Sequence, residues 1–315
     1  MPAPRHSRPL LAALPSLLAL ALLGFAVRWF AGRWQAVMAD GARPAVAWPW
    51  LGVATLLLFA HATTALFIWR QVLAAVGSAL TWREALDSFA PSLLARYVPG
   101  KVWASAVRLG LARRAGVRIG ASAGAILWET FVALGSAGVV ALAGLGLSGD
   151  PHAFGWPLVL VGGTVVAWIV AAVLSRHPRG AALLHRVGGT DPVRSPAALA
   201  PSVGTSFVGW LLFGAAHLAI ARAVAPVGFE AYPLMVGAVA LAWAGGYLAV
   251  VMPVGLGVRD GLLLLLLAPL LDPPRALLFV ALSRLVQLAV DASITLGWLL
   301  RQVTRPTAGA RPPSA

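Results

Sequence analysis

Long apolar segments separated by short polar segments run along the whole chain. A helix needs about 20 predominantly apolar residues to cross the hydrocarbon core of a bilayer. Six segments meet this requirement, at residues 10–28, 46–69, 120–146, 156–174, 205–225 and 276–300. We therefore predict an all-α polytopic membrane protein with about six spanning helices.

Two further apolar stretches, at residues 82–115 and 232–271, are interrupted near their middle. The last arm of the second stretch, residues 262–271, would rise only about 15 Å as a helix, about half of the hydrocarbon thickness. Irregular backbone at membrane depth survives only where protein buries it or where it lines a cavity. We therefore predict two re-entrant helical hairpins, and the residues at their breaks are Pro99, Gly100, Pro253, Gly255 and Gly257.

The order of these elements repeats along the chain with an offset of about 154 residues. The offset lays the first three spans on the last three, and it lays Pro99 on Pro253. If each hairpin returns to the side from which it enters, each half has three crossings, and an odd number makes the two halves inverted. We predict one transmembrane domain over residues 1–315, with a first repeat at 1–150 and an inverted second repeat at 151–315.

Composition and charge support a membrane location and a topology. The chain is 60% apolar and 11% charged, with a mean hydropathy of +0.85, which is too apolar for a soluble domain of this size. Of its 24 Arg and Lys residues, 17 fall in the segments that become cytoplasmic if the N-terminus is inside. The positive-inside rule therefore predicts that both termini are cytoplasmic. It also explains the net charge of +14 without nucleic-acid binding. The excess of Ala, Arg, Gly and Pro is typical of a GC-rich bacterial genome, so we expect the protein in a bacterial inner membrane.

Basic side chains lie next to both predicted hairpin breaks. Lys101 and Arg108 follow the first break, and Arg259 follows the second. The N-terminal end of a helix favours an anion because its backbone N–H groups are free and its dipole is positive there. We therefore interpret Lys101, Arg108 and Arg259 as a cradle for a phosphate group. The opposing interpretation assigns such cations to topology, and we favour it for Arg96, Arg113, Arg114 and Arg118.

Ionisable residues within the predicted spans are a second sign of function. Each costs about 2.5–3.5 kcal/mol near the centre of a membrane helix, and Glu129, Arg284 and Asp291 lie in such positions. Arg284 and Asp291 are two helical turns apart and so share one helix face. The offset places Glu129 on Ser283, the neighbour of Arg284. Two interpretations stay open: a structural ion pair between Glu129 and Arg284, or a role in gating or headgroup binding. Mutual neutralisation of Arg259 by Asp260 also stays open.

The sequence gives little support for metal or nucleophilic chemistry. It has no cysteine, which excludes disulfides and thiolate metal sites. His61 and His217 are single imidazoles on apolar segments, which favours hydrogen-bonded packing residues over metal ligands. Residues 120–124 match the G-x-S-x-G pattern of a nucleophile, yet they also match a packing motif of small residues. We predict no metal, no cofactor and no enzyme activity, with an intramembrane hydrolase that uses Ser122 and His217 as a minor alternative.

The second break carries a recognisable motif. Residues 253–260 read Pro-Val-Gly-Leu-Gly-Val-Arg-Asp, and Ser283 and Arg284 follow on the last span. With the two hairpins, this motif resembles the flippase-like transmembrane domain family of lysylphosphatidylglycerol synthase over about residues 10–300. That family shows Pro-Gly-Gly-x-Gly-x-Arg-Glu at this break, so Val254 and Asp260 are conservative departures. The resemblance implies binding or movement of a lipid, and we expect no synthase activity because the soluble domain of full-length relatives is lacking.

The expected function is therefore movement of membrane lipid by a flippase-like transporter. The cargo would be a phospholipid or a polyprenyl-phosphate-linked lipid, with its headgroup held by Lys101, Arg108, Arg259 and Arg284. The sequence has no ATP-binding motif, so a gradient or downhill movement would drive transport, with coupling or gating by Glu129, Asp260 and Asp291. The first alternative is a scaffold, without transport, for a partner enzyme of the cell envelope.

Overall fold

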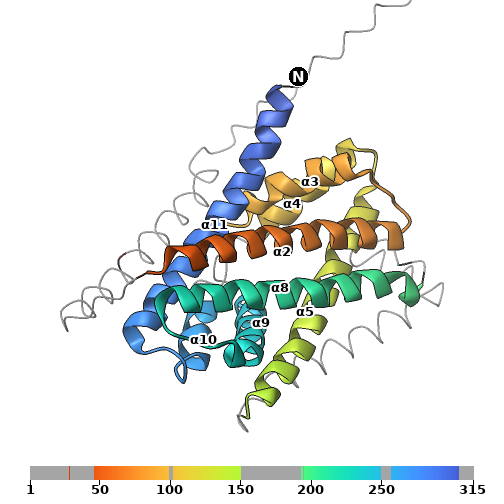
Figure 1. Ribbon diagram of the computed structural model, residues 1–315. Helices are drawn as coiled ribbons and strands as arrows, with labels where there is room; N and C mark the ends of the chain where they lie inside the picture. Colours follow the sequence, from red (N-terminus) through yellow and green to blue (C-terminus); the bar gives the residue numbers. More distant parts are fainter. Residues whose placement is uncertain are drawn as a thin grey trace, which may run out of the picture.

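The computed structural model describes residues 28, 46–98, 102–149, 193, 195–249 and 257–304. Within these residues the chain forms α-helices and two short 3-10 helices, Pro196–Leu199 and Phe229–Ala231, and it forms no β-strand. The α-helices are α2 (Trp48–Ala75), α3 (Trp82–Ala95), α4 (Val102–Arg114), α5 (Ile119–Leu147), α8 (Ala200–Val224), α9 (Tyr232–Leu248), α10 (Val258–Leu266) and α11 (Pro273–Val303) (Figure 1). The described part of the protein is therefore all-α, as predicted.

Five helical segments in the described residues are long and apolar enough to cross a membrane. Four of them contain α2, α5, α8 and α11 and coincide with the spans predicted at 46–69, 120–146, 205–225 and 276–300. The fifth, Phe229–Leu248, contains α9. The spans predicted at 10–28 and 156–174 lie outside the described residues, except for Arg28. The fold is that of an all-α polytopic membrane protein.

Each interrupted apolar stretch contains two helices that contact each other, α3 with α4 and α9 with α10. The second pair is unequal, because α9 is long enough to span a membrane whereas α10 has only nine residues. Gly257 precedes α10 directly, but Pro99, Gly100, Pro253 and Gly255 lie outside the described residues. The re-entrant course of the two stretches therefore stays a prediction.

Polar caps fix where two of the helices begin. Thr81 precedes α3, and its hydroxyl accepts a hydrogen bond from the Glu84 backbone N–H while the Glu84 carboxylate accepts one from the Thr81 N–H at 2.8 Å. Hydrogen bonds from the Thr81 side chain, and then from its backbone, lower the pKa of the Glu84 carboxyl. Asp272 caps α11 by accepting a hydrogen bond from the Arg275 N–H at 2.9 Å. Both caps join residues that are three positions apart in the sequence.

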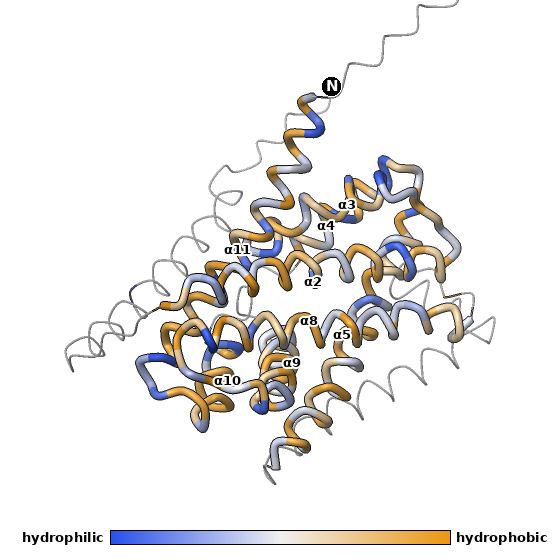
Figure 2. Tube along the Cα trace, in the orientation of Figure 1, coloured by the Kyte–Doolittle hydropathy of each residue, from blue (hydrophilic) through white to orange (hydrophobic). Residues whose placement is uncertain are grey.

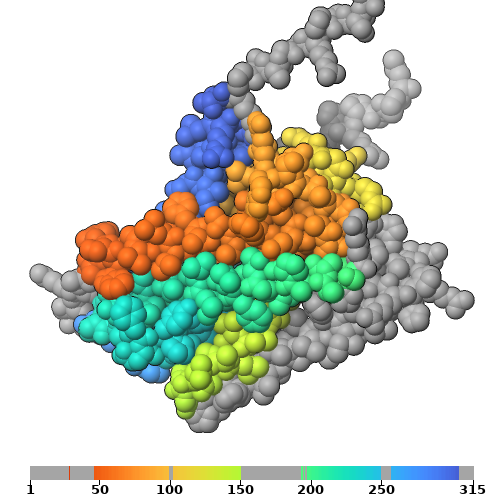
Figure 3. Space-filling view, turned by 45° about the vertical axis from the view of Figure 1, so that its right-hand side comes forward, coloured from red at the N-terminus to blue at the C-terminus, as the bar shows by residue number. Residues whose placement is uncertain are grey.

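Helices α2 and α8 lie side by side and antiparallel at the centre of the molecule (Figure 1). At one end the Ala47 N–H donates a hydrogen bond to the Ala223 carbonyl at 2.8 Å. At the other end the Gln71 amide donates to the Thr205 hydroxyl at 3.1 Å. Figure 3 shows the two helices running together across one face of the molecule. Their inner faces contribute to the largest apolar cluster, to which α5, α9, α10 and α11 also contribute.

Hydrophobic residues follow most of the length of the helices, and hydrophilic residues gather near helix ends and turns (Figure 2). Many apolar side chains remain exposed on the outer faces of α2, α5 and α11, including Leu56, Val139 and Leu285. Such faces are expected where lipid, not water, surrounds the protein.

The helices of the two predicted repeats follow one another in the same order and make matching contacts. The series α2, α3, α4, α5 is followed by α8, α9, α10, α11. Helices α5 and α11 begin at residues 119 and 273, and 273 − 119 = 154 is the offset seen in the sequence. The two series can be matched helix by helix, so that α2 corresponds to α8 and α5 to α11. Among the described α-helices, each pair in substantial contact then corresponds to a pair that is also in contact. For example, α5 contacts α9, and α11 contacts α3.

Candidate functional site

Two adjoining cavities of about 210 Å³ and about 270 Å³ lie among the helices. The smaller one is lined mainly by α2, α3, α8 and α11, and the larger one mainly by α4, α5 and α9, with Arg259 of α10. We call the two together the central cavity, because both are lined by Arg96, Arg108, Glu129, Trp243 and Gln287.

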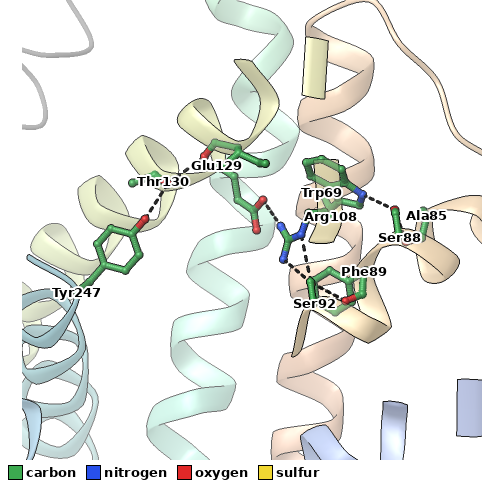
Figure 4. A network of polar contacts seen from close by, with 10 residues as sticks. Trp69, Ala85, Ser88, Phe89, Ser92, Arg108, Glu129, Thr130 and Tyr247 are labelled. Atoms are coloured by element: carbon green, nitrogen blue, oxygen red, sulfur yellow. Dashed lines mark hydrogen bonds and ion pairs between the residues drawn. The ribbon is translucent and has the colours of Figure 1, made fainter. Parts of the chain in front are cut away.

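Arg108 of α4 and Glu129 of α5 form an ion pair on the wall of the central cavity, with Arg108 Nη1 2.5 Å from Glu129 Oε2. The guanidinium also donates to the Ser92 hydroxyl at 3.4 Å. It lies 4.9 Å from the ring centre of Trp69 and 5.0 Å from that of Phe89. Figure 4 shows Glu129 and Ser92 on either side of Arg108. Arg108 is therefore held by a carboxylate, a hydroxyl and two aromatic rings.

Asp260 of α10 and Arg284 of α11 form a second ion pair. Arg284 Nε and Nη2 both donate to Asp260 Oδ1, at 3.0 Å and 2.8 Å. Asp260 Oδ2 accepts a hydrogen bond from the N–H of Gly257, whose φ of +88° is readily adopted only by glycine. The pair between Glu129 and Arg284, which the sequence left open, is therefore not formed. Glu129 pairs with Arg108 of α4, and Arg284 pairs with Asp260 of α10. Each ion pair therefore lies within one predicted repeat.

Asp291 of α11 holds the end of α3. Its Oδ2 accepts hydrogen bonds from Arg96, which also makes an ion pair with it, and from the Tyr97 hydroxyl at 2.7 Å. Asp291 is only 3% exposed. The sequence favoured a purely topological role for Arg96, but the structure places this residue on the wall of the central cavity with a buried carboxylate.

Arg259 of α10 is only 4% exposed and has neutral partners alone among the described residues. Its Nη1 donates to the Gln287 carbonyl oxygen at 3.2 Å. Its Nη2 lies 3.3 Å from His217 Nε2, its guanidinium carbon lies 5.7 Å from the ring centre of Phe213, and its Nε has no partner there. Successive helix residues point about 100° apart, so Asp260 faces Arg284 while Arg259 faces α8. Asp260 therefore does not pair with Arg259.

The hydrogen bonds of His217 fix its tautomer. His217 Nδ1 lies 2.8 Å from the Phe213 carbonyl oxygen, which can only accept a hydrogen bond. Nδ1 therefore carries the proton, and Nε2 is free to accept a hydrogen bond from Arg259. The imidazole is neutral, so Arg259 makes no ion pair among the described residues.

The alternative hydrolase pair is not formed. Ser122 is fully buried, and its hydroxyl has no hydrogen-bond partner among the described residues. Both nitrogens of His217 are engaged elsewhere, by Phe213 and Arg259. His61 contacts the Gly209 carbonyl at 3.0 Å, and the described residues contain no group of three or more side chains that could hold a metal ion.

The structure brings together most, but not all, of the predicted site residues. Arg108, Glu129 and Arg259 line the larger part of the central cavity, and Asp291 lines the smaller part. Asp260 and Arg284 form their ion pair beside it. Lys101 lies outside the described residues, together with the breaks Pro99, Gly100, Pro253 and Gly255.

Sequence reasoning missed several polar residues of the cavity wall, among them Tyr97, Tyr247 and Gln287. Gln287 had a detectable signal, because it stands three residues after Arg284 and four before Asp291 and so shares their helix face. Tyr247 had none, since its hydroxyl meets the Thr130 hydroxyl at 3.1 Å only after α9 packs on α5 (Figure 4).

Comparison with known proteins agrees with the resemblance inferred from the second break. No curated protein matches the chain. Residues 13–294, which include every charged residue of the central cavity, match the family model described as the lysylphosphatidylglycerol synthase TM region. This match covers most of the chain, so the protein belongs to the family of lysylphosphatidylglycerol synthase transmembrane regions.

Proposed function

We propose that this protein moves an anionic lipid across the membrane and holds the lipid headgroup in the central cavity. The observation that carries the proposal is Arg259, a nearly fully buried cation whose described partners are all neutral. Such a charge is costly in a membrane protein unless a counter-charge reaches it. Arg96 and Arg108 line the same cavity, where each is already paired with a carboxylate.

The two halves of the chain act as inverted repeats whose relative movement opens the cavity to each side in turn. The antiparallel packing of α2 on α8 supports this, as do the matching helix contacts. The ion pairs add further support, because Arg108–Glu129 joins α4 to α5 and Asp260–Arg284 joins α10 to α11. The offset moves 108 and 129 to 262 and 283, within two residues of the second pair. Each half is thus held together by its own ion pair.

Three ion-paired carboxylates are the candidates for coupling or gating. Glu129, Asp260 and Asp291 each hold one arginine. Protonation of one carboxylate would neutralise it and free its partner, which would loosen one helix contact at a time. A proton gradient could bias the movement of the halves in this way.

The proposed topology predicts opposite accessibility for two exposed loops. Ala79 follows the C-terminal end of α2, and Pro226 follows the C-terminal end of α8. Because α2 and α8 are antiparallel, these loops lie on opposite sides of the membrane, with Ala79 inside. The chain has no cysteine, so Ala79→Cys and Pro226→Cys can be labelled singly. In intact cells an impermeant maleimide should label only Pro226→Cys, and permeabilised cells should label both. Labelling of Ala79→Cys in intact cells would contradict this topology.

Reconstitution of the purified chain into liposomes tests the function directly. Fluorescent lipids with anionic, zwitterionic or neutral headgroups are placed in both leaflets, and an impermeant quencher reports movement from the inner leaflet. We expect the fluorescence of anionic lipid from the inner leaflet to be quenched faster in protein-containing vesicles than in protein-free ones. Equal rates for every headgroup in both preparations would instead favour a scaffold for a cell-envelope enzyme.

A further inference from the structure

Four arginines lie in and beside the central cavity, and they face only three carboxylates among the described residues. Three of the arginines each have a carboxylate of their own. Four guanidinium groups against three carboxylates leave one positive charge, and His217 is neutral because its Nε2 accepts a hydrogen bond. The charge that remains belongs to Arg259. The three complete pairs are Arg96–Asp291, Arg108–Glu129 and Arg284–Asp260.

Gln287 stands where the fourth carboxylate would be. It lies on α11 between Arg284 and Asp291, on the helix face that supplies the other ion pairs of this helix. Its carbonyl oxygen accepts a hydrogen bond from Arg259 Nη1 at 3.2 Å, the only hydrogen bond that its side chain makes with the described residues. Gln and Glu have nearly the same shape, so the choice between them at this position is a choice of charge.

The amide leaves Arg259 able to bind a further group. A guanidinium has five N–H donors, and two are used here, one toward Gln287 and one toward His217. Each terminal nitrogen therefore keeps a second N–H, and a guanidinium can donate two bonds to one phosphate or carboxylate. Arg259 also lines the larger part of the central cavity, whose volume of about 270 Å³ suits a headgroup and not a whole lipid.

We propose that Gln287 determines specificity by withholding a carboxylate from Arg259, so that the cavity binds a group with one net negative charge. This inference rests on the proposed function, which it deepens by naming the charge of the cargo headgroup. A phosphodiester is the simplest group of this kind. A pyrophosphate-linked headgroup carries more negative charge than the described residues balance.

Substitution of Gln287 by glutamate supplies the missing carboxylate without changing size. Thermal unfolding of the purified full chain in detergent is followed with dioctanoylphosphatidylglycerol, with inorganic phosphate and with dioctanoylglycerol, which lacks the phosphate. The wild type should be stabilised by several degrees by the phosphatidylglycerol, less by inorganic phosphate at equal concentration, and not by dioctanoylglycerol. Gln287→Glu should unfold at a higher temperature than the wild type without ligand, and its affinity for the phospholipid should fall at least about tenfold.

Gln287→Met separates the effect of charge from that of packing, because it has similar length and no charge. Its response to phosphatidylglycerol should be closer to that of the wild type than to that of Gln287→Glu. An undiminished ligand response in Gln287→Glu would overturn the inference, and so would an equal loss in both variants.

The same variants separate this inference from the proposed function. Ligand stabilisation of the wild type without lipid movement in liposomes would overturn the function and leave the anion site standing. Equal lipid movement by the wild type and Gln287→Glu would overturn the role of Gln287 and leave the function standing. Stabilisation by inorganic phosphate alone would assign the site to a free anion and remove its support for lipid transport.

Discussion

Replacing Arg259 by alanine is expected to abolish the movement of anionic lipid in reconstituted liposomes. Truncation of a buried, hydrogen-bonded charge at a binding site costs about 2–5 kcal/mol, a loss of at least about thirty-fold in affinity. Arg259→Lys should retain part of the activity, because an ammonium keeps the charge but cannot present the planar pair of donors. The rates of the two variants, measured with one fluorescent anionic lipid, should therefore rank as wild type, lysine and alanine.

Stability measurements distinguish a cargo site from a structural one. Without cargo, Arg259 is a buried cation that makes no ion pair with the described residues, so Arg259→Ala should unfold at the same temperature as the wild type or higher. Arg108→Ala should behave differently, because it leaves Glu129 without its partner. Removal of one member of a buried ion pair costs about 3–5 kcal/mol, and this pair is partly buried, so we expect a destabilisation below that range.

Arg275→Ala is the matched control for Arg259. Arg275 pairs with Asp272 at the surface, where the arginine side chain is 45% exposed, so its loss should leave both stability and lipid movement unchanged. Normal lipid movement by a well-folded Arg259→Ala would contradict the site and move the headgroup contact to Lys101 and Arg108.

The spanning helices could be predicted from the sequence because length and hydropathy are local properties. The last span was expected at 276–300, and α11 covers Pro273–Val303. The sequence pattern also gave the offset of about 154 residues that separates the starts of α5 and α11. The pattern located the ends of the helices only to within a few residues. Apolar runs do not mark the polar caps that fix the first turn, such as Asp272.

The partners of the buried charges could not be predicted in the same way. Residue spacing tells which side chains share a helix face, as it did for Arg284 and Asp291, but not which neighbouring helix that face meets. Arg284 meets α10 and Asp291 meets the end of α3. Successive residues of a helix point about 100° apart, so the rotation of α5 about its axis decides which neighbouring helix Glu129 meets. The role of a neutral polar residue was harder still to predict. Gln287 carries no charge, so the cost of placing a charge in a membrane does not single it out.

The close contact between α5 and α9 is the part of the fold most sensitive to a small substitution. A Cβ atom on Gly144 would lie 2.7 Å from the backbone nitrogen of Gly237, and a Cβ atom on Gly237 would lie 2.8 Å from that of Leu145. Backbone atoms on both sides cannot move aside as a flexible side chain could, so the helices would have to separate. Small residues at such a contact allow close packing of membrane helices.

Gly144→Ala should therefore destabilise the protein by about 3 kcal/mol or more, at or above the upper end of ordinary overpacking. Lipid movement should fall with it, because α9 carries Trp243 and Tyr247 to the wall of the central cavity. Thermal unfolding in detergent and the monodisperse fraction in size-exclusion chromatography measure the first effect, and the liposome assay measures the second. Gly52→Ala in α2 is the matched control, since its new Cβ would meet nothing within 4 Å. The control should be neutral or more stable by about 0.5–1 kcal/mol, because alanine is the better helix former. If Gly144→Ala and Gly52→Ala unfolded at the same temperature, α5 and α9 would not pack through these glycines.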